Sequence, residues 1–151
     1  MSTQIKSHTE LHTALNRQTA NWTLLGVKLH HYHWYVSGPQ FFTLHAKFEE
    51  LYTEAATYVD DLAERLLAIG GQPASTMTQY LALSDLKEAS GGETAQEMVA
   101  QLVKDFAVVT GELKSTISAA EELGDQPTAD LLTGIRTSVE KSAWMLNAFL
   151  A

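Results

Sequence analysis

The chain contains no cysteine, and this absence excludes several kinds of chemistry. Disulfides, thiolate-bound metals, iron–sulfur clusters and a cysteine nucleophile all need that side chain. Proline is also scarce, with 3 in 151 residues, so little interrupts long helices. No apolar run approaches the roughly 20 residues of a membrane-spanning helix, and the first residues lack an apolar targeting segment. We therefore expect one cytoplasmic domain over residues 1–151 that has no membrane partner.

Basic residues are outnumbered, with 10 lysines and arginines against 18 acids and a formal net charge of -8. Such a chain is a poor counterion for phosphate, because nucleic-acid binding depends on lysine and arginine. The residues before the first expected helix carry only Lys6 as a fixed positive charge. We therefore expect no direct binding to DNA.

Histidines and acids occupy different parts of the chain. All six histidines lie at or before His45, whereas every acid except Glu10 lies at or after Glu49. The boundary between the two groups places imidazoles close to carboxylates, and both are ligands of iron, zinc and manganese.

Helical periodicity covers most of the sequence. Glycine and proline interrupt it at residues 37–39, 70–73 and 124–127, which predicts long helices over about 9–35, 40–69, 94–123 and 128–150. A short helix over 75–83 is expected inside the long middle connection, with Ser75 as its N-cap, and Thr128 is expected to cap the last helix. Trp22 and Trp144 are expected in the core. These lengths predict an all-α four-helix bundle with a crossover between its second and third long helices.

Two pairs of candidate ligands share one face of the second expected helix. His45 and Glu49 are spaced i, i+4, as are Asp60 and Glu64. At about 100° per residue, the four side chains fall within about 100° of one another. His45 and Asp60 are nevertheless about 22 Å apart along the helix axis, so one chain cannot bring both pairs to one metal.

An antiparallel copy of the same helix removes this difficulty. If two such helices cross near residues 54 and 55, His45 and Glu49 of one chain meet Asp60 and Glu64 of the other. This geometry predicts a dimer with metal at its interface. The alternative is an ordinary solvated helix face, which is the usual meaning of a single His-x3-Glu or Asp-x3-Glu pair.

Several segments resemble Dps proteins, the dodecameric mini-ferritins. They are YHWYVSGPQFFTLH (32–45), FEELY (48–52), DDLAER (60–65), IGG (69–71) and WML (144–146). The resemblance covers nearly the whole chain. It implies an all-α, ferritin-like four-helix bundle with a short extra helix in the crossover.

The resemblance also implies iron chemistry. A two-iron ferroxidase centre would take His33, His45 and Glu49 from one subunit and Asp60 and Glu64 from its two-fold partner. Many family members have aspartate at the position of Glu49. The implied activity is oxidation of Fe²⁺ to Fe³⁺, preferentially with hydrogen peroxide, and storage of ferric oxyhydroxide inside the dodecamer as protection against oxidative stress. The alternative is a DNA-compacting nucleoid protein with incidental iron binding, which the missing basic tail disfavours.

Further residues have family-derived roles. Trp34 adjoins the expected centre and is a candidate radical sink, or else a packing residue. Asp125 and Asp130 belong to an acidic group that could line an iron-entry pore, because acids repeated around a three-fold axis attract cations. Glu50 and Glu54 are candidates for nucleating mineral.

Overall fold

The computed structural model describes residues 5–151, and every regular element in that range is a helix. Four long helices and one short helix are present: α1 (His8–Tyr35), α2 (Phe41–Ala68), α3 (Met77–Leu83), α4 (Ala95–Glu122) and α5 (Gln126–Leu150). The prediction of an all-α bundle with a short helix in the crossover is confirmed. Within the described range, no helix combines the length and apolar character needed to cross a membrane.

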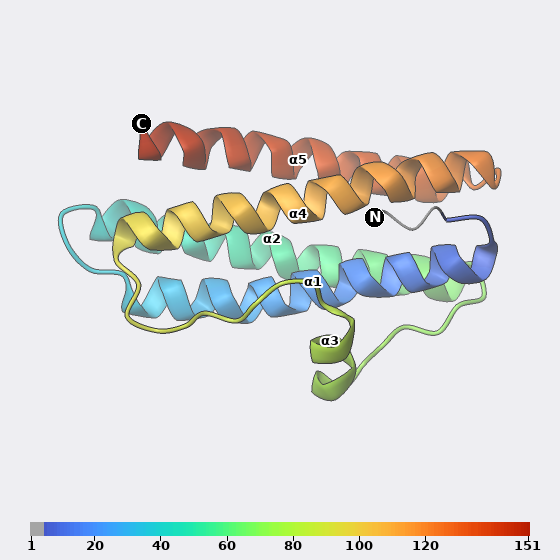
Figure 1. Ribbon diagram of the computed structural model, residues 1–151, viewed down its shortest axis with the longest axis horizontal. Coiled ribbons are helices and arrows are strands. Elements are labelled where there is room, and N and C mark those ends of the chain that lie inside the picture. The colour runs from blue at the N-terminus through green and yellow to red at the C-terminus, as the bar shows by residue number, and fades with distance from the viewer. Residues whose placement is uncertain (1–4) are drawn as a thin grey trace.

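The long helices form two hairpins that pack against each other. α1 pairs with α2 and α4 pairs with α5, while the connection between α2 and α4 runs back along the length of the bundle and carries α3 outside it (Figure 1). This crossover lies against α1, to which the short α3 is also packed. The chain therefore reaches α4 at the end of the bundle where α1 finishes and α2 begins.

Side-chain caps explain where several helices begin. Thr76, and not Ser75, caps α3, because its hydroxyl accepts from the Gln79 N–H while the Gln79 side chain accepts from Thr76 N–H. Asp125, and not Thr128, caps α5 by accepting from the Thr128 N–H. Both cap predictions were wrong. The second failed because a proline is tolerated in the first helical turn, so Pro127 does not delay the start of α5.

Glycine ends two of the long helices. Gly70 follows α2 with φ of 87°, and the Gly71 N–H then bonds back to the carbonyl of Leu66 at 2.8 Å. Gly124 has φ of 76° after α4, and the Asp125 N–H bonds to the carbonyl of Ala120 at 2.8 Å. Both backbones lie in the left-handed region, which a side chain disfavours.

The core consists of the inward stripe of each long helix. The apolar positions expected to be buried on the first helix are all 2% exposed or less: Leu11, Leu15, Trp22, Leu25 and Leu29. The placement of Trp144 in the core was wrong, since its side chain is 67% exposed. Ser142 and Leu146 face inward on α5, and Trp144 is two residues, or about 200°, from each of them.

Polar side chains on α1 attach the crossover to the bundle. Asn16 donates to the Gln72 carbonyl and accepts from the Ala74 N–H, and Asn21 accepts from Ser84 and from the Asp85 N–H. These bonds satisfy backbone groups of an irregular segment that has few other partners.

Candidate metal centre

The centre begins with two histidines on neighbouring helices. His33 lies near the end of α1 and is 9% exposed, and His45 lies one turn into α2. Their rings stack at 3.7 Å between centroids with 13° between planes. His33 Nδ1 lies 2.7 Å from the carbonyl of His45, and His45 Nδ1 lies 2.7 Å from the carbonyl of His33.

This reciprocal pairing determines the tautomer of both rings. A carbonyl oxygen can only accept, so each Nδ1 must carry a proton and donate it. In the neutral imidazole, each Nε2 then keeps a free lone pair, which is the form that binds a metal ion. Backbone carbonyls that orient ligand histidines in this way are typical of metal sites. The pairing of α1 with α2 thus presents two oriented nitrogen atoms as candidate ligands.

Aromatic rings surround the histidine pair. Phe41 stacks on His45 at 4.9 Å, and the Tyr52 ring stands edge-on to His33 at 5.4 Å and 87°. Trp34, beside His33, is 68% exposed and lies 5.2 Å from His30 between ring centroids. The Trp34 ring is therefore accessible for contact with another chain.

Glu49 is the first acid along α2, and its side chain is exposed. The hydroxyl of Tyr52 donates to Glu49 Oε1 at 3.3 Å. Partial burial, followed by the charge and hydrogen bond of Glu49, raises the pKa of Tyr52, so the phenol keeps its proton and acts as a donor. In the sequence, Tyr52 drew notice only as the last residue of the segment FEELY (48–52). A tyrosine three residues after a ligand acid could have indicated this contact.

Asp60 and Glu64 lie farther along α2 and are both exposed. Within residues 5–151, neither carboxylate has a hydrogen bond or ion pair with another side chain. In that same range, no three histidine, aspartate or glutamate side chains of one chain come close enough to hold a metal. A single chain therefore presents the nitrogen ligands and the distal carboxylates as separate groups.

The predicted pore acids differ in their surroundings. Asp130 is exposed and accepts from Gln126, whereas Asp125 accepts from Arg65 at 2.9 Å and caps α5. Burial acts to raise the pKa of Asp125, but bonds from Thr128 and the guanidinium of Arg65 outweigh it and lower that pKa. The negative charge of Asp125 is thus already balanced by Arg65 within the chain. Asp130 has no such cationic partner among the described residues.

The predicted nucleation acids lie one turn apart on α2. Glu50 is exposed and pairs with Lys47 at 3.4 Å. Partial burial, and then the charge of Glu50, raises the pKa of Glu54, while Lys47 opposes this shift. Lys47 therefore reduces the negative potential that this pair presents.

A buried ion pair was not anticipated from the sequence. Lys28 Nζ lies 2.7 Å from Asp105 Oδ2, with side chains 1% and 5% exposed, and also donates to the carbonyl of Lys87 at 2.8 Å. Gln101 donates to the other oxygen of Asp105. The pair joins α1, α4 and the crossover less than two turns before His33.

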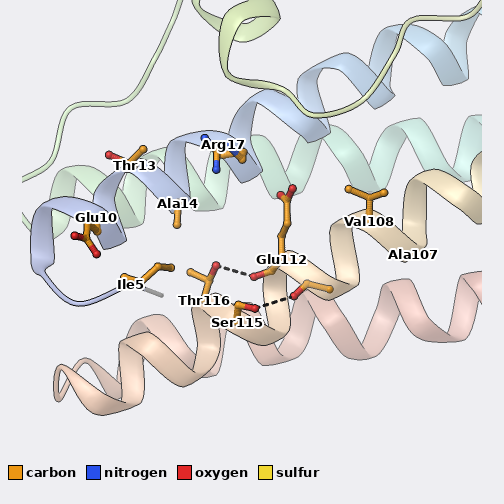
Figure 2. A pocket seen from close by; sticks show the side chains of 11 residues that line it. Ile5, Glu10, Thr13, Ala14, Arg17, Ala107, Val108, Glu112, Ser115 and Thr116 are labelled. Carbon is orange, nitrogen blue, oxygen red and sulfur yellow. Dashed lines mark hydrogen bonds between the residues drawn. The ribbon is translucent and has the colours of Figure 1, made fainter. Parts of the chain in front are cut away.

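A cavity of about 650 Å³ opens between α1 and α4, away from the candidate ligands (Figure 2). The Glu112 side chain extends from α4 toward α1 there and accepts from buried Gln18 and Asn21 at 3.3 and 2.9 Å. Burial, followed by hydrogen bonding and charge from Asp85, raises the pKa of Glu112 from 4.5 to about 8, against the effect of Arg17. Glu112 is therefore largely protonated at neutral pH.

Comparison with known proteins places these features in a family. The sequence-family model of the ferritin-like domain matches residues 12–151. A protein of Bacillus anthracis named DNA protection during starvation protein 2 is 57% identical over 136 residues, covering 90% of this chain and 93% of that protein. The crystal structure of Dps from Staphylococcus aureus superposes with a TM-score of 0.95 at 46% identity, covering 97% of this chain and 99% of that one. This chain belongs to the Dps family.

A third relative connects the Dps fold with metal chemistry. Dps from Vibrio cholerae O1, described as a member of a broad superfamily of ferritin-like diiron-carboxylate proteins, matches with a TM-score of 0.91 at 34% identity, over 95% of this chain and 90% of that one. The family assignment made from the sequence motifs is confirmed. This Dps protein thus shares its fold with a superfamily named for paired irons held by carboxylates.

Proposed function

We propose that this Dps protein is a ferroxidase that oxidises Fe²⁺, preferentially with hydrogen peroxide, and stores the product as ferric oxyhydroxide inside a shell of twelve chains. In the cytoplasm this activity removes both reactants of radical-forming chemistry and so protects against oxidative stress. The observation that carries the proposal is the His33–His45 pair, in which reciprocal bonds to main-chain carbonyls leave both Nε2 atoms free for metal.

Each centre spans two chains in this proposal. His33, His45 and Glu49 come from one chain, and Asp60 and Glu64 come from a two-fold related partner. Two facts support the division: His45 and Asp60 are separated by about 22 Å along α2, and Asp60 and Glu64 are exposed. Carboxylates and imidazoles suit iron in both oxidation states, and carboxylates stabilise the added charge of Fe³⁺.

The electron balance explains why paired irons are useful. Each Fe²⁺ gives up one electron, and hydrogen peroxide accepts an electron from both irons of one centre and is reduced to water with two protons. No hydroxyl radical is released when both electrons arrive together. The Fe³⁺ then hydrolyses, and the acidic chain favours the entry of further cations.

Secondary roles are proposed for five further side chains. Trp34 would intercept stray oxidising equivalents at the centre. Asp130, with Asp125, would attract Fe²⁺ at an entry pore, and Glu50 and Glu54 would nucleate mineral. Of the two pore residues, Asp130 has the less occupied carboxylate.

The second candidate function is compaction of DNA, because the Bacillus anthracis relative is named for DNA protection. The charge of -8 per chain argues against direct contact with phosphate. A gel-shift assay with the purified assembly at low salt and without added metal tests this. We expect unretarded DNA, and retarded DNA would favour compaction.

Anaerobic loading with Fe²⁺ followed by hydrogen peroxide tests the ferroxidase. We expect fast formation of Fe³⁺ in the wild type. The rate should fall about 100-fold when His33 and His45 are both replaced by alanine, because both nitrogen ligands of the proposed centre are then removed. Replacing His8 and His12, a second histidine pair on α1, is the matched control. Equal rates in the His33/His45 variant and the control would contradict the site.

Mixed assemblies test the shared centre directly. One variant lacks His33 and His45, the other lacks Asp60 and Glu64, and each alone is expected to be inactive. In a mixed dimer, one centre receives both defects and the other receives none. Random mixing of equal amounts should therefore restore about a quarter of wild-type activity. A mixture as inactive as its components would show that the ligands act within one chain.

A further inference from the structure

We infer that Tyr52 is a positioning residue for Glu49, with its ring supported by His30. This inference rests on the proposed ferroxidase centre and assigns a role to two residues outside its ligand set. Tyr52 donates its hydroxyl to Glu49 Oε1 from one helical turn farther along α2. This bond occupies Oε1 and leaves Oε2 to accept from or bind another partner.

The Tyr52 ring is held by contacts with α1. His30 lies flat against it at 3.7 Å between centroids with 16° between planes, and His33 lies nearly perpendicular to it at 5.4 Å between centroids. Tyr52 therefore bridges the two helices that carry the nitrogen ligands, and its hydroxyl is placed relative to His33. A glutamate has more rotatable bonds than an aspartate, so its position benefits more from such a contact.

His30 contributes the face of its ring. Its Nδ1 is buried and has no hydrogen-bond partner among the described residues. A nitrogen left in this way does not anchor the imidazole, whereas the near-parallel stack on Tyr52 does. Another flat ring at this position should therefore serve equally well.

The variant Tyr52→Phe keeps the stacked ring and removes only the hydroxyl. Tyr58→Phe is the matched control, because Tyr58 is another partly buried tyrosine of α2 that packs against Trp22, away from Glu49. The probe is Co²⁺ binding to the complete assembly, followed by its visible absorption. We expect Tyr52→Phe to weaken Co²⁺ binding about tenfold and to alter the spectrum, as loss of an outer hydrogen bond does at metal sites, with Tyr58→Phe unchanged.

Two further comparisons distinguish positioning of Glu49 from a general effect on packing. In Glu49→Ala, adding Tyr52→Phe should change Co²⁺ affinity no further, because the hydroxyl acts through that carboxylate. His30→Phe should retain the affinity that His30→Ala lowers. The inference would be overturned if Tyr52→Phe binds Co²⁺ as tightly as Tyr58→Phe does. It would also be overturned if Tyr52→Phe weakens Co²⁺ binding by the same factor in the wild-type and Glu49→Ala backgrounds.

The two proposals fail in different ways. A wild-type assembly that binds Co²⁺ but does not oxidise Fe²⁺ contradicts the ferroxidase, and the cobalt comparison still decides the role of Tyr52. A wild-type assembly that binds no Co²⁺ contradicts both.

Discussion

The two ends of α2 carry similar ligand types in different settings. At the first end, His45 is stacked and bonded to α1, and Glu49 is held by Tyr52. At the other end, Asp60 and Glu64 project into solvent. One chain thus preorganises the nitrogen half of the proposed centre and leaves the distal carboxylates hydrated. Binding of metal would then require little rearrangement on one side and desolvation on the other.

The largest expected effect concerns α1, the helix that supports the nitrogen half of the proposed centre. Asp105→Ala leaves the buried Lys28 charge without its partner and should lower the free energy of unfolding by about 3–5 kcal/mol. Thermal unfolding at fixed protein concentration measures this, with the exposed neighbour Lys104→Ala as control. Combining Asp105→Ala with Lys28→Met should recover most of the loss. Equal unfolding of Asp105→Ala and Lys104→Ala would show that the pair does not anchor α1.

A smaller effect compares the two ends directly. His33→Ala removes a buried ring and a hydrogen bond to a carbonyl, and should lower the free energy of unfolding by about 1–3 kcal/mol. Asp60→Ala with Glu64→Ala should leave it within about 0.5 kcal/mol, because both side chains are exposed. Denaturant unfolding of the metal-free protein distinguishes them. If the acidic pair proves the more destabilising change, the contrast between the ends is wrong.

A pH-dependent effect tests a different face of α1. The folded state raises the pKa of Glu112 from 4.5 to about 8, so the folded chain holds a proton that the unfolded chain releases. This contribution to stability is fully present below about pH 4.5 and is lost as the pH rises toward 8. Glu112→Gln should therefore raise the unfolding temperature at pH 8 and leave it little changed at pH 4.5. Asp130→Asn, an exposed acid on α5, serves as control, and a pH-independent shift would exclude this linkage.

Much of the fold could be predicted because its signals are local. The expected long helices end close to the observed ends, since glycine and proline punctuate the sequence at each turn. The shared face of His45, Glu49, Asp60 and Glu64 follows from helical periodicity alone. Their joint binding of iron stays a prediction that the variants above test.

What could not be predicted depends on tertiary contacts. The bonds from His33 and His45 to each other's carbonyls need the α1–α2 pairing, and a lysine such as Lys28 usually indicates a solvated position. Asp125 was expected only as a pore acid, and the structure shows that it caps α5 and that Arg65 occupies its carboxylate. Trp144 lies on the outward face although its residue type favours burial.

The residues proposed to bind iron all lie between positions 33 and 64, on the first hairpin. That hairpin joins helices that are neighbours in sequence, and such local pairings form early and fast. During synthesis from the N-terminus, the hairpin can form while α4 and α5 are still being made. The His33–His45 pair could therefore be assembled before the bundle closes, and the second hairpin is left to complete the core without having to carry any of the ligands.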